Sequence, residues 1–170
     1  MELINEYEIN KDVITEFMKR AMRTLVLYSF VIGLGGLFFS IVLFREENKF
    51  LLGVVVAASL VSLITGILIV PYTVKEHMKQ VTALHGSNRP KTMIRFTEEG
   101  IFLNEGDASI KREYTNVVQV FETKHLWMLM FGKYMGIPVR KDGFTHGTNE
   151  DFRKLMKEVL PANVKGRDKL

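Results

Sequence analysis

The sequence predicts a membrane α-helical hairpin joined to an α+β domain, and two observations carry this prediction. The first is a pair of apolar runs without a charged residue, residues 25–44 and residues 50–70. The second is a change of hydrophobic period near residue 91, from helical to extended spacing, before a last amphipathic helix. We expect a strand and juxtamembrane helix over residues 1–24, a two-span hairpin over 25–72, a connecting helix and linker over 73–90, and the sheet domain over 91–170.

The two apolar runs have the length of membrane spans. A helix rises about 1.5 Å per residue, so about 20 residues cross a hydrocarbon layer ~30 Å thick. Four of the five residues between the runs, residues 45–49, are charged, and we expect them to turn the chain at the membrane surface. A pair of core helices in a soluble protein is the alternative, which two adjacent charge-free runs of this length disfavour.

Basic residues near the ends of the spans predict their orientation. The turn carries Arg45 and Lys49, whereas the outer ends carry Lys19, Arg20, Arg23, Lys75 and Lys79. Because Lys and Arg are enriched on the cytoplasmic side, we expect a multi-pass protein of the cell membrane with both termini in the cytoplasm.

Small residues recur at helical spacing within both runs. They are Ser29, Gly33, Gly36 and Ser40 in the first run and Ala58, Ser62 and Gly66 in the second. Small residues let helices approach closely in lipid, so we expect the two stripes to face each other. The runs contain hydroxyl groups but no ionisable side chain, which disfavours a pore or a transport pathway.

The first residues of the chain predict a strand and then a helix. Apolar residues alternate with glutamates over residues 3–9, and because a lone strand leaves its backbone unpaired, we expect this strand to join the C-terminal sheet. Asn10 is placed to cap a helix with an apolar stripe from Val13 to Met22. The stripe can lie among lipid headgroups or pack on the soluble domain; the polar face is not strongly basic, which favours packing.

Pro71 is expected to end the second span, and a connecting helix to run from there to a C-cap at Gly86 and a linker over residues 85–90. Beyond the linker, short β-rich runs alternate with turn signals such as Glu98-Glu99 and residues 105–107. The predicted strands are residues 91–97, 100–104, 108–114, 117–123, 125–131 and 134–139. The run over residues 125–131 is apolar on both faces and suits a strand that is covered on both sides.

The last helix is expected to begin at Thr148, with Asp151 in capping-box position, and to end at Pro161. Its apolar stripe is Phe152, Leu155, Met156, Val159 and Leu160, which requires a sheet to cover. We expect Phe152 to anchor this helix over Trp127. The residues Trp127, Met128, Met130, Phe131 and Met135 suit core packing or a ligand pocket, and the use of Met to fill cores favours packing.

Several short motifs in order resemble the YcxB-like bacterial membrane proteins. They are the opening YEINKDVITEF, FTEEGI over residues 96–101, Ile110 with Tyr114, VFET over residues 120–123, and an Ile-Pro-x-Arg element with Phe144. The resemblance implies a cytoplasmic C-terminal domain similar to a pleckstrin-homology (PH) fold, a bent antiparallel sheet closed by a helix. It brings no enzymatic activity and no catalytic residues.

The residues themselves predict no catalytic centre, cofactor or metal site. The chain has no cysteine, which excludes a disulfide framework and a thiol nucleophile. No two histidines lie at metal-ligand spacing. The carboxylate pairs Glu98-Glu99 and Glu150-Asp151 suit a turn and a first helical turn, where acids favour the helix dipole. We therefore expect a protein that is not an enzyme.

Basic residues give the one candidate for a binding surface. From residue 73 onward the chain has 17 Lys and Arg against 12 Asp and Glu. Anionic headgroups attract such residues by about 1 kcal/mol each near a membrane, and nucleic acid is not an expected partner. The candidates for binding lipid headgroups or an acidic partner, rather than for a merely solvated surface, are Lys111, Arg112, Lys124, Arg140, Lys141, Arg153, Lys154 and Lys157, with Lys133 as a further basic position.

Two classes of function stay open. The first is a membrane-anchored, non-catalytic binding or scaffold module that presents a PH-like domain to a protein partner or to anionic lipid. The second is an accessory subunit of a membrane enzyme or transporter, with the chemistry in another chain. The first is favoured because motifs for catalysis and for transport are both missing from the sequence.

Overall fold

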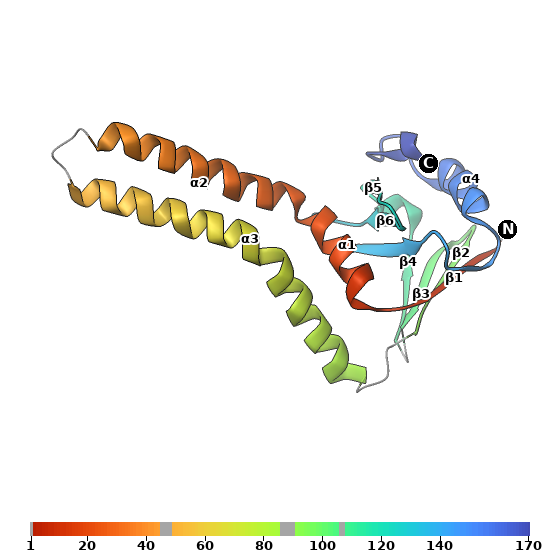
Figure 1. The fold of residues 1–170 in the computed structure, drawn as a ribbon. Coiled ribbons are helices and arrows are strands. Elements are labelled where there is room, and N and C mark those ends of the chain that lie inside the picture. Colours follow the sequence, from red (N-terminus) through yellow and green to blue (C-terminus); the bar gives the residue numbers. More distant parts are fainter. Residues whose placement is uncertain (1, 45–48, 86–90, 106–107) are drawn as a thin grey trace. The chain divides into compact units, whose positions relative to one another are not determined.

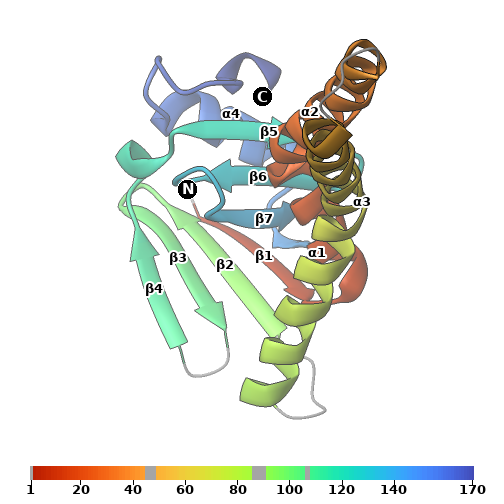
Figure 2. The same ribbon diagram turned by 90° about the vertical axis from the view of Figure 1, so that its left-hand side faces the viewer.

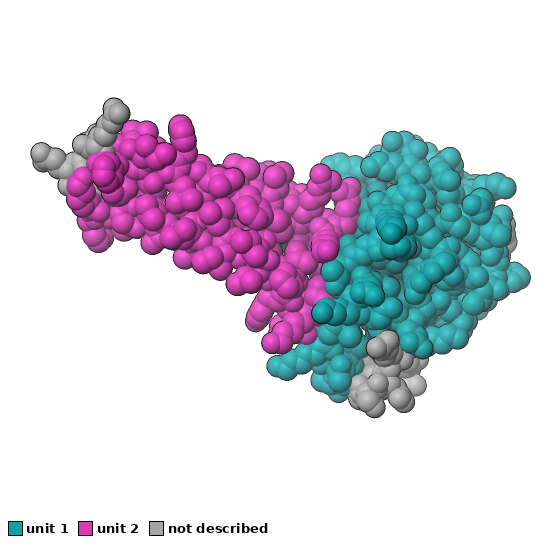
Figure 3. Space-filling view, viewed as in Figure 1, with its two compact units in different colours: residues 1–17, 77–170 teal, residues 18–76 magenta. Residues whose placement is uncertain are grey.

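The computed structural model describes residues 2–44, 49–85, 91–105 and 108–170. These residues form two compact units (Figures 1 and 3). The helical unit is Met18–Glu76, and the sheet unit joins Met1–Phe17 to His77–Leu170. Residues 45–48 of the predicted turn, residues 86–90 of the predicted linker with the Gly86 cap, and the turn residues 106–107 lie outside the described residues. Lys49 of the predicted turn and His85 of the predicted linker are the two ends of α3.

The helical unit contains α2 (Arg23–Leu43) and most of α3 (Lys49–His85). Both helices are long and apolar enough to cross a membrane. The small residues of α2 face α3 as predicted, because a Cβ added at Gly33 would lie 2.5 Å from Leu63 Cγ. The Ser62 hydroxyl donates a hydrogen bond of 2.9 Å to the Ser29 carbonyl oxygen.

One prediction for the second apolar run is wrong in detail, because Ala58 is exposed and Ser59 takes its place, buried against Gly36. The predicted second span and connecting helix form one continuous helix, since α3 runs through Pro71 to His85. A proline removes one amide donor and bends a helix without ending it when the turns on both sides keep their bonds.

The sheet unit contains two antiparallel sheets. One has the strand order β4-β3-β2-β1-β8, formed by Ala108–Arg112, Gly100–Glu105, Lys91–Thr97, Leu3–Glu8 and Phe144–His146. The other has the order β5-β6-β7, formed by Gln119–Glu122, Leu126–Met130 and Gly136–Arg140 (Figure 2). The short helices α1, η1, α4 and η2 span Lys11–Ala21, Tyr114–Asn116, Asn149–Val159 and Arg167–Lys169.

The N-terminal strand joins the sheet, which confirms the prediction. β1 pairs antiparallel with β2, from Leu3 opposite Phe96 to Glu8 opposite Lys91, and with the short β8 on its other side. Its buried side chains also reach the second sheet, because the Tyr7 hydroxyl donates to the Pro138 carbonyl oxygen at 2.8 Å. Residues from before the helical hairpin thus complete the sheet that follows it.

The helix α1 begins as predicted. Asn10 Oδ1 accepts a hydrogen bond of 2.9 Å from the Val13 backbone amide, which caps the helix. Val13, Ile14 and Phe17 are buried in the protein, so the packing alternative is confirmed for this first half of the apolar stripe, whereas Met18, Ala21 and Met22 are partly exposed.

Two strands of the second sheet begin two residues later than predicted, β5 at Gln119 and β7 at Gly136. β6 is buried along its whole length, as expected for a strand covered on both faces. β7 begins at Gly136 and not at Tyr134, because the Phe131 amide donates to the Met135 carbonyl oxygen and closes a tight connection. Tyr134 and Met135 are therefore exposed, and the assignment of Met135 to the core is wrong.

The closing helix α4 packs on the core as predicted. Thr148 and Asp151 form a capping box, in which each side chain accepts a hydrogen bond from the other's backbone amide. Phe152 is fully buried; its ring lies 5.2 Å from that of Phe96 and 6.3 Å from that of Trp127, between centroids. Phe152 is thus the anchor between α4 and both sheets.

Candidate functional site

The predicted basic residues are distributed over several elements. Lys111 and Arg112 are neighbours on β4, so their side chains leave opposite faces of the sheet. Lys124 lies between β5 and β6, and Arg140 ends β7 with Lys141 beside it. The remaining three, Arg153, Lys154 and Lys157, lie on α4.

Two of these cations meet at one aromatic ring. Lys141 Nζ lies 5.1 Å from the centre of the Trp127 ring, and the Arg153 guanidinium carbon lies 5.9 Å from it. The indole N–H of Trp127 donates to Asn149 Oδ1 at 2.8 Å, which fixes the ring beneath them. Cations are attracted to the face of an aromatic ring. Because Arg153 and Asn149 belong to α4 and Trp127 belongs to β6, these contacts hold the start of α4 on β6.

Ion pairs neutralise part of the basic set. Lys141 Nζ donates to Glu122 Oε1 at 2.7 Å, and the Arg140 guanidinium donates to both carboxylate oxygens of Asp142, at 2.8 and 2.6 Å. The two hydrogen bonds between Arg140 and Asp142 raise the pKa of Arg140 and lower the pKa of Asp142. Arg140 and Lys141 are thereby less available to an outside anion.

The other candidates differ in their surroundings. Lys111 Nζ lies 3.9 Å from Glu99, an exposed ion pair that contributes little. The remaining members of the set form no ion pair with any residue that the structure describes: Arg112, Lys124, Arg153, Lys154 and Lys157.

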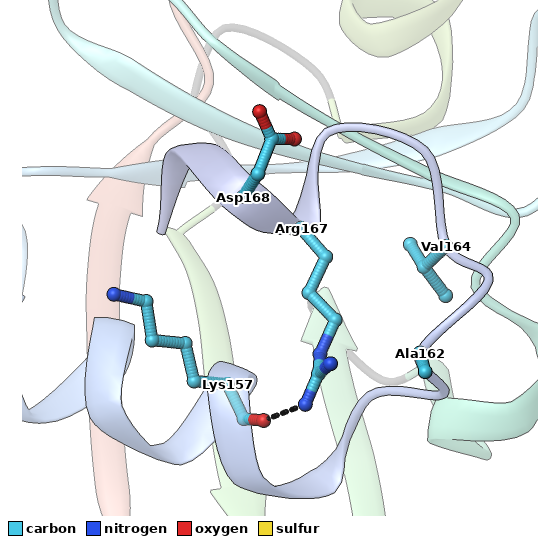
Figure 4. A pocket seen from close by; sticks show the side chains of 5 residues that line it. All are labelled: Lys157, Ala162, Val164, Arg167 and Asp168. Atoms are coloured by element: carbon cyan, nitrogen blue, oxygen red, sulfur yellow. Dashed lines mark hydrogen bonds between the residues drawn. The ribbon is translucent and has the colours of Figure 1, made fainter.

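A hollow of about 490 Å³ lies beside the end of α4, lined by Lys157, Ala162, Val164, Arg167 and Asp168 (Figure 4). Arg167 donates from Nη2 to the backbone carbonyl oxygen of Lys157 and so caps the last turn of the helix. The Lys157 ammonium and the Arg167 guanidinium point in different directions in Figure 4. The hollow therefore does not gather its two cations around one ligand.

The buried titratable groups have structural partners. Burial raises the pKa of Tyr7 and of Tyr114, and each hydroxyl donates to a backbone carbonyl oxygen. Partial burial opposes ionisation of Glu16, but hydrogen bonds from the backbone amide and ring of His125 outweigh it and lower the pKa of Glu16. Among the described residues, no three His, Asp or Glu side chains are grouped to hold a metal ion.

The sheet unit also exposes large apolar side chains that the sequence did not predict to be exposed. They are Ile110, Val118, Tyr134 and Met135. Gly132 is a turn signal, but it does not determine that the connection extends as far as Met135.

The comparison with protein families finds a match inside the sheet unit. Residues 96–156 match the family model described as YcxB-like protein. No curated protein and no solved structure matches the chain. The matched stretch runs from the end of β2 into α4 and contains Phe96, Trp127 and Phe152, the aromatic contacts at the centre of the core. The resemblance seen in the sequence is thereby confirmed over residues 96–156.

Proposed function

We propose that the chain is a membrane-anchored, non-catalytic binding or scaffold module. In this proposal α2 and the first part of α3 cross the cell membrane as a hairpin, with both termini in the cytoplasm. The sheet unit is a PH-like domain that the hairpin holds at the cytoplasmic surface, where it engages a protein partner or anionic lipid. The YcxB-like match supports the assignment of the domain but carries no activity.

The observation that carries the proposal is the exposure of large apolar side chains on the two helices. Phe38 on α2 is 72% exposed and Phe50 on α3 is 82% exposed. Helices of a soluble core bury such residues, and exposed apolar surface of this extent requires a covering medium. A bilayer supplies that medium, and the close contact at Gly33 and Ser62 is the kind of packing that holds helices together in lipid.

The topology of the sheet unit supports a PH-like domain. Its two antiparallel sheets and its C-terminal helix share one aromatic core at Phe152. β1 from the start of the chain supplies a strand between β2 and β8. Because the chain leaves the sheet unit after Phe17 and returns to it at His77, the hairpin is an insertion that is joined to the domain at two points of the chain.

The burial of polar groups supports binding over catalysis. Asn5 is fully buried, and its side-chain amide donates to and accepts from the Arg140 backbone. Tyr7 and Tyr114 also bond to backbone carbonyl oxygens. The side chains of Asn5, Tyr7 and Tyr114 thus form hydrogen bonds that join parts of the fold. In the proposal, a partner therefore meets the outer surface of the sheet unit.

Membrane fractionation tests the anchor. The chain is expected to remain with the membrane pellet after an alkaline wash. The double variant Val31→Asp with Ile64→Asp is expected to lose this retention, because aspartate costs about 2.5 to 3.5 kcal/mol at the centre of a span. The matched control Lys154→Asp, on the exposed side of α4, should be retained. Release of the unaltered chain by the wash would refute the anchor.

Co-purification after mild detergent extraction separates a binding module from an accessory subunit. We expect no stoichiometric enzyme or transporter chain to remain bound. A stable complex of that kind would instead favour the accessory-subunit function.

A further inference from the structure

The exposed apolar residues of the sheet unit are few. Among its described residues, large apolar side chains are exposed at four positions: Ile110 by 43%, Val118 by 53%, Tyr134 by 47% and Met135 by 57%. A folded domain normally exposes such residues singly, so their relative placement decides whether they form a surface.

The strand register brings three apolar side chains together. Val118 and Phe131 lie one residue beyond the last pair of β5 and β6, and Phe131 and Met135 lie one residue beyond the last pair of β6 and β7. The Phe131 amide donates to the Met135 carbonyl oxygen at 2.9 Å, which holds the second of these pairs. Phe131 and Met135 therefore share one face of the sheet. The Val118 amide donates to the Met130 carbonyl oxygen at 2.8 Å and so places Val118 at the same end of β6, where the three residues form an apolar row.

β4 of the other sheet adds to this row. Its Arg112 guanidinium carbon lies 5.9 Å from the centre of the Phe131 ring. Ile110 lies two residues before Arg112 and therefore on the same face of β4. Figure 2 shows β4 as the outermost strand of its sheet, so Ile110 and Arg112 stand at an open edge. We call this surface the open corner: Ile110, Val118, Phe131, Tyr134 and Met135, bordered by Arg112 and Lys133.

The cations of the open corner are not neutralised. Arg112 stacks on Phe131, and Lys133 Nζ lies 5.3 Å from the centre of the Tyr134 ring. Neither of the two forms an ion pair with any described residue. The nearby Glu113 carboxylate accepts a hydrogen bond from the Thr115 hydroxyl. The open corner thus combines exposed apolar and aromatic side chains with two positive charges that no described carboxylate pairs.

We infer that the open corner docks on an anionic lipid surface. Tyr134 and Met135, next to a connecting turn, enter the interfacial layer, while Arg112 and Lys133 meet the headgroup phosphates. Aromatic and aliphatic side chains next to Lys and Arg suit this layer because it offers hydrocarbon and negative charge together. The inference rests on the proposed function, since the hairpin keeps the sheet unit near a bilayer and raises the effective concentration of lipid.

Site-specific labelling tests this inference in the full chain. The chain has no cysteine, so Met135→Cys accepts a single environment-sensitive fluorophore. The labelled protein is reconstituted in vesicles of phosphatidylcholine alone or mixed with phosphatidylglycerol. We expect the emission to shift to the blue, and quenching by lipid-attached nitroxides to appear, only in the anionic mixture.

Charge variants identify the residues that carry the docking. Arg112→Gln and Lys133→Gln are each expected to weaken the docking equilibrium about fivefold, and together about 25-fold. The control pair Lys154→Gln and Lys157→Gln removes two exposed cations of α4 and should leave the signal unchanged. Equal loss in both pairs would overturn the assignment to the open corner.

A second label separates this inference from the proposed function. Ile64→Cys places the fluorophore on an exposed position of α3. An Ile64 label shielded by lipid with an aqueous Met135 label would overturn the open-corner inference alone, whereas two aqueous labels would overturn the anchor itself. A blue-shifted Met135 label that lipid-attached nitroxides do not quench would indicate a protein contact, and equal quenching without anionic lipid would show that the docking needs no negative charge. Either result would contradict the inference.

Discussion

Truncation of Phe152 to alanine removes the side chain at which α4 and both sheets meet. Phe152 is fully buried, with its ring 5.2 Å from Phe96, 5.6 Å from Phe144 and 6.3 Å from Trp127. Loss of a buried phenylalanine costs about 3 to 5 kcal/mol. The three aromatic neighbours place the expected cost in the upper half of this range, because each aromatic pair contributes about 0.5 to 1.5 kcal/mol of stability beyond that from buried area. We expect a loss of about 4 to 5 kcal/mol out of the ~5 to 15 kcal/mol that stabilises a domain.

The single tryptophan provides the assay. Trp127 is 1% exposed and contacts Phe152, so its emission reports the unfolding of this core. Urea titration is done on the full chain in micelles, because β1 lies between β2 and β8 and a fragment of residues 91–170 would lack it. The midpoint should fall sharply for Phe152→Ala, and the melting temperature by roughly 15 °C.

Two controls define what would refute this reasoning. Phe152→Leu keeps more of the side-chain volume and leaves a smaller cavity, so it should cost less than Phe152→Ala although it also loses the aromatic contacts. Lys154→Ala with Lys157→Ala alters exposed positions and should stay within about 0.5 kcal/mol for each residue. A Phe152→Ala midpoint equal to that of the unaltered chain would refute the packing of α4 on the sheets.

Three further predictions use the same chain. Gly33→Ile should separate α2 from α3, because even a Cβ at Gly33 would lie 2.5 Å from the Leu63 side chain of α3. The control is Gly35→Ile, since a Cβ at Gly35 would meet nothing within 4 Å. Distances between spin labels on the two helices should increase in the first variant and stay unchanged in the second. Hydrogen bonds from His125 lower the pKa of Glu16, so the stabilisation by Glu16 is present above the ordinary pKa of glutamate and is lost as the pH falls through the lowered value. In Glu16→Gln the urea midpoint should therefore fall less steeply as the pH is lowered. An equal fall in the variant and the unaltered chain would contradict this. Burial raises the pKa of Tyr7, so the contribution of its neutral hydroxyl to the free energy of unfolding is complete below the ordinary pKa near 10 and declines as the pH rises beyond that value. Tyr7→Phe should therefore lose less stability at alkaline pH than the unaltered chain. An equal loss in both proteins would refute this linkage.

The sequence predicted elements well where a local pattern determines them. Alternation around Leu3 and Tyr7 indicated β1, and the Thr148 capping box indicated the start of α4. The three-residue β8 was missed because so short a strand between turn residues has no period to read. The sequence did not show that the predicted second span and connecting helix are one helix, because local steric rules disfavour proline inside a helix, whereas the turns on both sides hold α3 together.

Choices that depend on tertiary contacts could not be made from spacing. Ala58 and Ser59 are both small, and adjacent helical positions differ by about 100° around the axis. Only the approach of α2 at Gly36 decides that Ser59 is the buried one.

The same limit applies to the candidate site. Lys141 resembled an available cation until the fold placed it 2.7 Å from Glu122, nineteen residues earlier in the chain. Met135 resembled a core residue until the connection after Phe131 left it 57% exposed. The sequence shows which residues are charged and which are apolar. Strand register determines which of the charges are paired and which of the apolar residues face outward.

The topology of the hairpin tests the central claim most directly. Reporters that distinguish the cytoplasm from the outside of the membrane are fused to either end of the full chain, beside Glu2 and beside Leu170. β1 pairs with strands that follow the hairpin, so both ends must lie on one side, and we predict that both report the cytoplasm. Ends that report opposite sides of the membrane would contradict the two-span anchor.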